Sequence, residues 1–356
     1  MTIWNEKSHA FLRKFNRKTT SGGLLDGLRF VIKDNISLAG FPTSWGFSPP
    51  AIPVASHTAP AVDLLLSQGA ICIGSTNLDI GAIGARGKNP YYGEMRYCSN
   101  PSQKVYGSSG GAAIAIGEGA SDFALVTDVA GSSRLPAIPK RLWGLKLKSE
   151  EAPTRGILRY HPTIDSLGII AGEYEILARV LESLKIGKSL NVITPLRLEL
   201  PKIPHLDSGK IPAFIKDAER IPLENFPLIK KARHIHQSLI ARSVRHVFRR
   251  LPPKSSDELR ALNELPMEKG DLDLNNEHQD LVLAAEQAFP KPSALLSFFP
   301  ARLKNVHSTL VPLLLVSNLL DWPALIVPFD KQILVHITGN TTSFDLLAIS
   351  SELTRR

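Results

Sequence analysis

Three short stretches of the sequence hold residue types that can carry out nucleophilic chemistry. They are Lys33-Asp34-Asn35, Gly107-Ser108-Ser109-Gly110-Gly111 and Thr127–Arg134, the last of which contains Ser132. A serine hydroxyl attacks a carbonyl at neutral pH only when a nearby base accepts its proton. A lysine can be that base where burial or cationic surroundings lower its pKa far enough to leave it neutral. One serine would be the nucleophile, and the second would relay the proton to the lysine.

Each stretch alone has a simpler interpretation. Lys-Asp-Asn is typical of a solvated turn, and Ser-Ser-Gly-Gly is typical of a linker. Thr-Asp-x-Ala-Gly-Ser could be a phosphate-binding turn, because small residues let backbone N–H groups approach an anion. The combination of all three in this order favours catalysis.

The order and spacing resemble those of the amidase signature family of serine amidohydrolases. The family's Gly-Gly-Ser-Ser-Gly-Gly motif is matched by residues 107–111, with Tyr106 in place of its first glycine, and a small-residue run follows at Ala112–Gly117. Its motif Thr-Asp-x-Gly/Ala-Gly-Ser-x-Arg-x-Pro-Ala is matched by residues 127–137. The resemblance covers most of residues 24–195 and returns at residues 311–353. It implies Ser132 as nucleophile, Ser108 as bridging serine and Lys33 as general base.

The loop around the nucleophile has a second expected role. Its backbone N–H groups, from Val129, Ala130, Gly131 and Ser132, are predicted to form an oxyanion hole. Losing one such donor in other enzymes costs roughly 3–4 kcal/mol of barrier. Three further residues are predicted to support the loops without taking part in the chemistry: Ser109, Asp128 and Arg134.

The resemblance also narrows the substrate. Thr76-Asn77-Leu78-Asp79 and Pro90-Tyr91-Tyr92-Gly93 are similar to the allophanate hydrolase branch of the family, which favours a small, polar, carboxylated amide. The amidase-like component of glutamyl-tRNA amidotransferase is another relative, and it acts only with partner subunits. Departures from the family pattern include Tyr106 and Asp321, which replace glycines, and a shortened middle region. They leave open one alternative, a catalytically weak or silent, partner-dependent subunit.

Composition favours a cytoplasmic enzyme, and no cofactor is predicted for the lysine–serine chemistry. The chain of 356 residues has no apolar run approaching the length of a membrane span, and its first residues contain no signal-like apolar core. The two cysteines, Cys72 and Cys98, fit a reducing compartment. The histidines show no metal-ligand spacing, so no metal site is predicted.

Alternating strand and helix patterns predict an α/β fold. The expected strands are 28–33, 71–74, 123–127, 190–194 and 333–338, and the expected helices are 58–68, 110–117, 173–185 and 344–353, with Thr58 capping the first. The resemblance implies a mixed β-sheet core sandwiched by helices. Residues 1–195 are predicted to form the core that carries the triad. Residues 196–305 would be a divergent, basic lid or partner-binding region, and residues 306–356 would complete the core with strands and a helix.

A basic helix is predicted at residues 228–251. No acidic residue lies between Asn225 and Ser256, so much of the net charge of +9 is concentrated there. The basic face could be a solvated surface, a docking surface for an acidic protein partner, or the source of an arginine that selects a carboxylated substrate. The acidic segment Asp271–Asp280 could instead neutralise it. The lack of RNA-binding aromatic motifs argues against nucleic acid. His234 and His236 are interpreted as neighbours on this helix.

Overall fold

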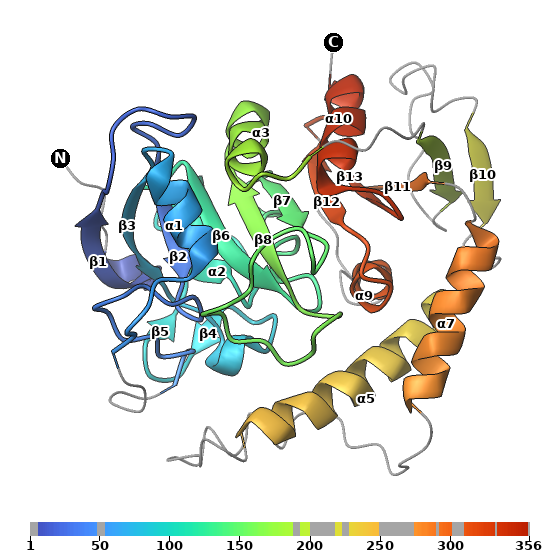
Figure 1. Ribbon diagram of the computed structural model, residues 1–356, viewed down its shortest axis with the longest axis horizontal. Coiled ribbons are helices and arrows are strands. Elements are labelled where there is room, and N and C mark those ends of the chain that lie inside the picture. Colours follow the sequence, from blue (N-terminus) through green and yellow to red (C-terminus); the bar gives the residue numbers. More distant parts are fainter. Residues whose placement is uncertain are drawn as a thin grey trace. The chain divides into compact units, whose positions relative to one another are not determined.

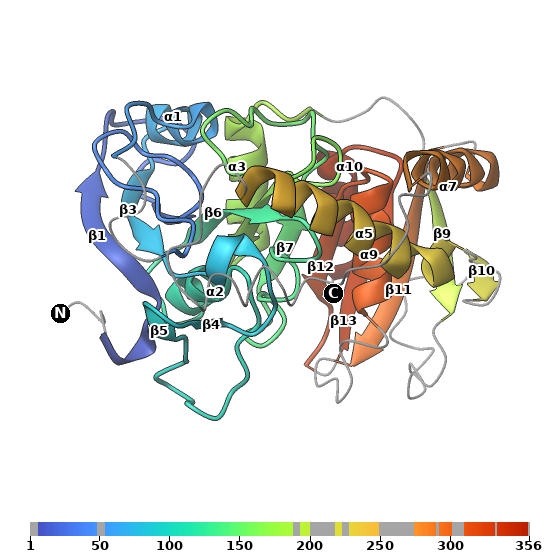
Figure 2. The same cartoon turned by 90° about the horizontal axis from the view of Figure 1, so that it is seen from below.

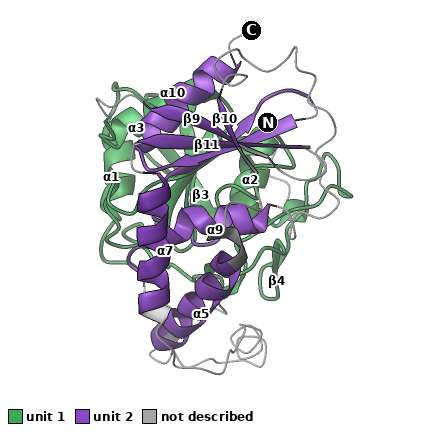
Figure 3. Cartoon of the chain, turned by 90° about the vertical axis from the view of Figure 1, so that its right-hand side faces the viewer, with its two compact units in different colours: residues 1–128, 132–159, 166–187 green, residues 129–131, 160–165, 188–356 purple. Residues whose placement is uncertain are grey.

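The structure is a computed structural model of a mixed α/β protein. It describes residues 6–47, 54–187, 193–199, 218–222, 228–248, 274–289, 292–300, 310–331 and 333–354. The chain divides into two compact units (Figure 3). Unit 1 comprises residues 1–128, 132–159 and 166–187, and unit 2 comprises residues 129–131, 160–165 and 188–356. The predicted domain division at residues 195 and 305 stays a prediction.

Unit 1 is built on a sheet with strand order β1-β3-β2-β6-β8-β7 (Figure 1). The strands are β1 (Phe11–Arg17), β2 (Arg29–Lys33), β3 (Ile71–Thr76), β6 (Phe123–Asp128), β7 (Trp143–Lys146) and β8 (Ser166–Ala171). A separate hairpin is formed by β4 (Lys88–Asn89) and β5 (Gly93–Glu94). The helices are α1 (Pro60–Ser67), α2 (Gly110–Gly117) and α3 (Tyr174–Ser183), with short 3-10 turns η1 (Glu6–Ser8) and η2 (Ile80–Ala82).

The pairing of these strands brings chemistry-bearing residues to one edge of the sheet. β2 is parallel to β6, with Ile32 opposite Leu125, whereas β8 is antiparallel to both β6 and β7. Lys33 ends β2, and Thr127 and Asp128 end β6. Because parallel strands present their carboxyl ends at the same edge, these side chains lie close together.

Helices cover both faces of the unit 1 sheet. Small residues of α2 pack on Val31, Ala124 and Ile170, whereas α3 packs on β8 and contacts α1. Figure 3 shows α2 on one side of the strands and α1 with α3 on the other. Strand side chains alternate between faces, so Phe30 and Phe123 point away from α2 and stack with ring centroids 5.2 Å apart. Such a pair contributes about 0.5–1.5 kcal/mol beyond the area that it buries.

Unit 2 has its own strands, in the order β12-β13-β11-β9-β10. They are β9 (Thr194–Glu199), β10 (Glu219–Pro222), β11 (Ser293–Pro300), β12 (Ala324–Pro328) and β13 (Ile333–Gly339). The helices are α5 (Leu228–Phe248), α7 (Leu274–Ala288), α9 (Val311–Leu319) and α10 (Ser343–Thr354). α10 packs on β12 and β13, and α5 packs against α9 and α7 (Figure 2).

Most expected elements are present, with three corrections. Thr58 does not cap the first helix, because that helix begins at Pro60 after Ala59, and the Thr58 hydroxyl instead accepts a hydrogen bond from the Ala39 N–H at 3.2 Å. The strand expected at 190–194 begins only at Thr194 and runs to Glu199, while residues 190–192 lie outside the described residues. The helix expected to reach Lys185 ends at Ser183. Among the described residues, no helix has the length and apolar character needed to cross a membrane.

Candidate active site

Lys33, Ser108 and Ser132 form a continuous chain of polar contacts in unit 1. The Lys33 Nζ lies 2.7 Å from the Ser108 Oγ, and the Ser108 Oγ lies 2.9 Å from the Ser132 Oγ. The backbone N–H of Ser108 also donates to the Ser132 Oγ at 3.2 Å. The Lys33 and Ser108 side chains are fully buried, whereas Ser132 is 7% exposed. The Ser108 hydroxyl therefore connects Ser132, which can act as a nucleophile, to Lys33, which can act as a base.

Lys33 and Ser108 have further partners that fix their positions. The Lys33 Nζ donates to the Thr127 Oγ1 at 3.1 Å, and the Asn35 Nδ2 donates to the same oxygen at 2.9 Å. The Ser108 hydroxyl donates to the Ala82 carbonyl at 2.7 Å. Thr127, Asn35 and Ala82 were not among the predicted site residues. Thr127 belongs to the nucleophile motif and Asn35 follows Lys33 by two residues, so both could have been found from the motifs. The Ala82 carbonyl has no side-chain signal.

Glycines let the two serine loops approach the rest of unit 1. The peptide bond between Gly107 and Ser108 is cis, and a Cβ atom at Gly107 would overlap the Oδ2 of Asp79. On the sheet, a Cβ at Gly168 would lie 2.6 Å from the Ser133 Cβ, so β8 needs a glycine where the nucleophile loop crosses it. Gly131 has a φ of 105°, which favours glycine directly before Ser132.

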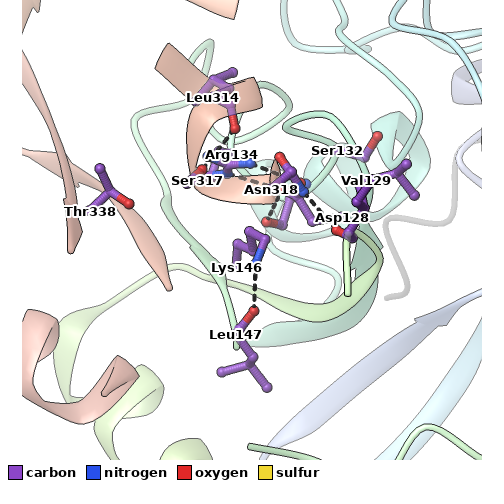
Figure 4. A network of polar contacts seen from close by, with 12 residues as sticks. Asp128, Val129, Ser132, Arg134, Lys146, Leu147, Leu314, Ser317, Asn318 and Thr338 are labelled. Carbon is purple, nitrogen blue, oxygen red and sulfur yellow. Dashed lines mark hydrogen bonds and ion pairs between the residues drawn. The ribbon is translucent and has the colours of Figure 1, made fainter. Parts of the chain in front are cut away.

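A buried ion pair joins the two residues that flank the nucleophile loop, Asp128 before Ser132 and Arg134 after it. The Asp128 carboxylate accepts hydrogen bonds from the Ser133 N–H at 3.0 Å and the Ser133 Oγ at 2.7 Å. It also accepts from the Arg134 Nε at 3.1 Å and Nη2 at 2.9 Å (Figure 4). Burial alone would raise the pKa of Asp128, but the Arg134 guanidinium and the Ser133 donors outweigh it and hold that pKa well below its usual range. The loop that carries Ser132 is thus tied back to the end of β6.

Asp79 is a second buried carboxylate near the triad. It accepts backbone N–H groups from Arg86 at 3.2 Å and from Gly87 at 3.3 Å. Burial raises its pKa to about 6, although these hydrogen bonds and the positive charge that Lys33 carries when protonated oppose the rise. Asp79 therefore lies within electrostatic reach of the lysine and against the glycine that precedes Ser108.

The remaining predicted residues have distinct surroundings. The Ser109 Oγ is buried with no hydrogen-bond partner in the described part of the chain. Val129 and Gly131 are buried, and Ala130 is half-buried. The Val129 carbonyl oxygen lies 2.6 Å from the Nε2 of His236 on α5, a contact that the sequence did not predict. Within the described ranges, no group of three or more metal-binding side chains could hold a metal ion.

Comparison with known proteins gives the family. A family model of amidases matches residues 2–191, which is more than half of the chain. The chain belongs to the amidase signature family. Membership in this amidohydrolase family agrees with the resemblance carried by the Lys33, Ser108 and Ser132 motifs.

Two relatives of known identity match about half of this chain. One subunit of the glutamyl-tRNA(Gln) amidotransferase from Halobacterium salinarum is 32% identical over 174 residues, which are 49% of this chain and 41% of that protein. The corresponding subunit from Treponema pallidum is 37% identical over 175 residues, covering 49% and 34%. This chain thus matches less than half of the length of these curated relatives.

Solved amidase-family structures share the fold of this chain. Kluyveromyces lactis allophanate hydrolase has a TM-score of 0.78 at 21% identity, covering 98% of this chain and 67% of that one. A peptide amidase from Stenotrophomonas maltophilia has a TM-score of 0.71 at 20% identity, covering 93% and 82%.

Proposed function

We propose that this protein hydrolyses the C–N bond of a small amide through an acyl-enzyme on Ser132. The observation that carries the proposal is the buried sequence of contacts from the Lys33 Nζ through the Ser108 Oγ to the Ser132 Oγ, with distances of 2.7 and 2.9 Å. Burial disfavours a charged ammonium, which suits Lys33 to accept a proton. In this proposal Ser132 is the nucleophile, Ser108 the bridging serine and Lys33 the general base.

The proton count at Ser108 defines how the relay would work. Its hydroxyl has one hydrogen but lies within 2.9 Å of the Lys33 Nζ, the Ala82 carbonyl and the Ser132 Oγ. A carbonyl can only accept, so while Ser108 donates to Ala82, Lys33 and Ser132 must both donate to the Ser108 Oγ. Relay requires Ser108 to turn its hydrogen from Ala82 to a neutral Lys33. The Ser132 proton then follows onto the Ser108 oxygen.

The covalent steps follow from this transfer. The Ser132 oxygen forms a bond to the amide carbon, and the carbonyl electron pair moves onto oxygen. Backbone N–H groups of Val129, Ala130, Gly131 and Ser132 are the proposed donors to that oxyanion. The C–N bond then breaks, and the amine leaves with the proton held by Lys33 and Ser108. Water then attacks the ester carbon while the Ser108 and Lys33 relay accepts its proton. The bond from the acyl carbon to the Ser132 oxygen breaks, the carboxylic acid leaves, and the relay returns the proton to Ser132.

Ammonia release from a panel of small primary amides tests the proposal. The panel includes allophanate and glutamine, since allophanate hydrolase and glutamyl-tRNA amidotransferase are related to this chain. Turnover by the wild type, lost in folded Ser132→Ala and Lys33→Ala, is the expected result. Turnover retained in Ser132→Ala would contradict it.

The free Cys72 and Cys98 are compatible with the proposed cytoplasmic location.

The second candidate is a partner-dependent subunit, which α5 favours. Lys231 and Arg242 are exposed on this helix and lie on one stripe, with half-buried Arg245 beside them. The related amidotransferase chains are each named as one subunit of that enzyme. We propose that this stripe binds an acidic protein partner, whose carboxylates would pair with the cations.

Binding of polyglutamate to the full chain tests this second candidate. A Lys231→Gln/Arg242→Gln variant should bind more weakly, and the loss should be largest at low salt. Arg155→Gln is the matched control, because Arg155 is an exposed arginine of unit 1. Equal binding by all three proteins would contradict the docking surface. Preference for tRNA over polyglutamate would replace the acidic protein with nucleic acid.

A further inference from the structure

A buried histidine, which has no part in the proton relay from Lys33 to Ser132, contacts the segment that precedes Ser132. His236 lies on α5 and is 3% exposed. Its Nε2 lies 2.6 Å from the Val129 carbonyl oxygen, and both residues belong to unit 2. Because a carbonyl oxygen only accepts, the Nε2 must carry the hydrogen of this bond.

The geometry of the peptide group gives this contact a consequence. The Val129 carbonyl and the Ala130 N–H belong to the same planar peptide unit, where they point in opposite directions when the bond is trans. Fixing the direction of the carbonyl therefore fixes the direction of the N–H. A carbonyl that accepts a strong hydrogen bond also polarises its peptide unit, which makes the N–H a better donor.

The helix is built to hold the histidine in one place. Ile235 and Leu239 beside it are buried, and α5 packs against α9 and α7. A side chain locked by such packing positions its donor without further loss of rotamer freedom. Burying an imidazole carries a desolvation cost that an apolar residue would avoid, and the hydrogen bond to the Val129 carbonyl offsets part of that cost.

We propose that His236 is a positioning residue, which orients the Val129–Ala130 peptide so that the Ala130 N–H can stabilise the oxyanion. The inference rests on the proposed function, because only an acyl-transfer site needs this donor. In this proposal α5, whose sequence stands out for its basic residues, also takes part in the chemistry through His236.

The reaction of the full-length protein with a fluorophosphonate, followed by intact mass, measures this role. The tetrahedral adduct places an oxygen where the oxyanion forms, so the second-order rate reports on the donors. His236→Leu removes the hydrogen bond and should slow labelling by roughly ten- to a hundredfold. His236→Gln keeps an amide donor at a similar reach and should restore most of the rate. His234→Leu changes an exposed histidine on the same helix and should react like the wild type.

Two further measurements separate positioning from simple packing. Leu239→Ala loosens α5 but leaves the donor, so its labelling rate should stay near that of the wild type. Nitrogen-15 NMR of the wild-type imidazole should show the hydrogen on Nε2, whether or not the His236 variants fold. Equal slowing in His236→Leu, His236→Gln and Leu239→Ala would overturn the proposal, as would hydrogen on Nδ1 alone. A wild type that takes no label refutes the proposed function itself, and this inference with it; a wild type that reacts no faster than His236→Leu refutes only the role of His236.

Discussion

Removing Arg134 should strongly destabilise the protein, because its partner Asp128 has no access to solvent. Both side chains of this pair have 0% relative exposure, and their closest approach is 2.9 Å between the Nη2 and the Oδ1. In Arg134→Met the Asp128 carboxylate keeps its hydrogen bonds to Ser133 but loses its buried countercharge. Breaking one side of a buried pair costs about 3–5 kcal/mol. We expect the free energy of unfolding to fall by this amount at pH 7.

An exposed ion pair of similar length provides the matched control. Lys88 and Glu94 lie 2.7 Å apart, with side-chain exposures of 59% and 57%. Exposed pairs contribute about 0.2–1 kcal/mol, so Lys88→Met should barely change the free energy of unfolding. Urea unfolding followed by circular dichroism measures both variants. Comparable losses in Arg134→Met and Lys88→Met would refute the argument that burial decides the cost.

The pH dependence gives the same prediction a second signature. The low pKa of Asp128 stabilises the folded protein above the unfolded-state value near 3.8, and this stabilisation is lost as the pH falls below it. In Arg134→Met, burial is no longer offset by the guanidinium, so the carboxyl can be protonated at higher pH. The penalty of the substitution should therefore shrink between pH 7 and pH 4. Asp128→Asn/Arg134→Met should lose less stability than the two single losses added together.

Three further outcomes are expected. Thr127→Val removes the 3.1 Å hydrogen bond from the Lys33 Nζ. The variant should lose about 1–3 kcal/mol of stability and react more slowly with the fluorophosphonate. An unchanged labelling rate would show that Lys33 is positioned without this hydrogen bond. The pKa of Asp79 is raised from 3.8 to about 6, so the folded protein binds this proton more tightly than the unfolded chain, and stability falls as the pH rises through this window. Relative to Asp79→Asn, the wild type should lose on the order of 3 kcal/mol of stability between pH 4 and pH 7 in urea titrations. Parallel pH profiles of the two proteins would contradict this. Gly107→Ala places a methyl group against Asp79 and should abolish labelling by the fluorophosphonate. Gly172→Ala is the control and should be labelled at the wild-type rate, because the nearest atom to its new methyl group would lie 3.7 Å away. Equal labelling rates in the two variants would show that the Gly107 loop can move aside.

The motif residues account for most of what the sequence could predict about the site. Lys33 lies at the end of a short apolar strand, and the Thr127–Arg134 motif follows another, so the sequence predicted a strand end for each group but not the pairing of the two strands. The register of β2 and β6 then brings the lysine beside Thr127. The strand ends are predictable because they depend on local sequence patterns, whereas the parallel pairing of β2 with β6 is a tertiary contact that these patterns do not give.

Other parts of the site depend on contacts that no local pattern encodes. The Ala82 carbonyl reaches Ser108 from a 3-10 turn, through backbone atoms that every residue has. His236 resembles any histidine on an amphipathic helix until α5 is placed beside Val129. Thr58 has the composition of a helix cap, but its hydroxyl accepts a hydrogen bond from Ala39 instead. In these cases tertiary contacts, which sequence spacing does not specify, decide the role.

The most direct test of the proposed mechanism is the intact mass of the full-length protein after treatment with a fluorophosphonate. The contacts from Lys33 through Ser108 to Ser132 predict a single adduct on the wild type and none on folded Ser132→Ala or Lys33→Ala. An adduct that persists on Ser132→Ala would place the reactive nucleophile elsewhere. A folded wild type that takes no adduct would contradict the activated serine and turn attention to the exposed cations of α5.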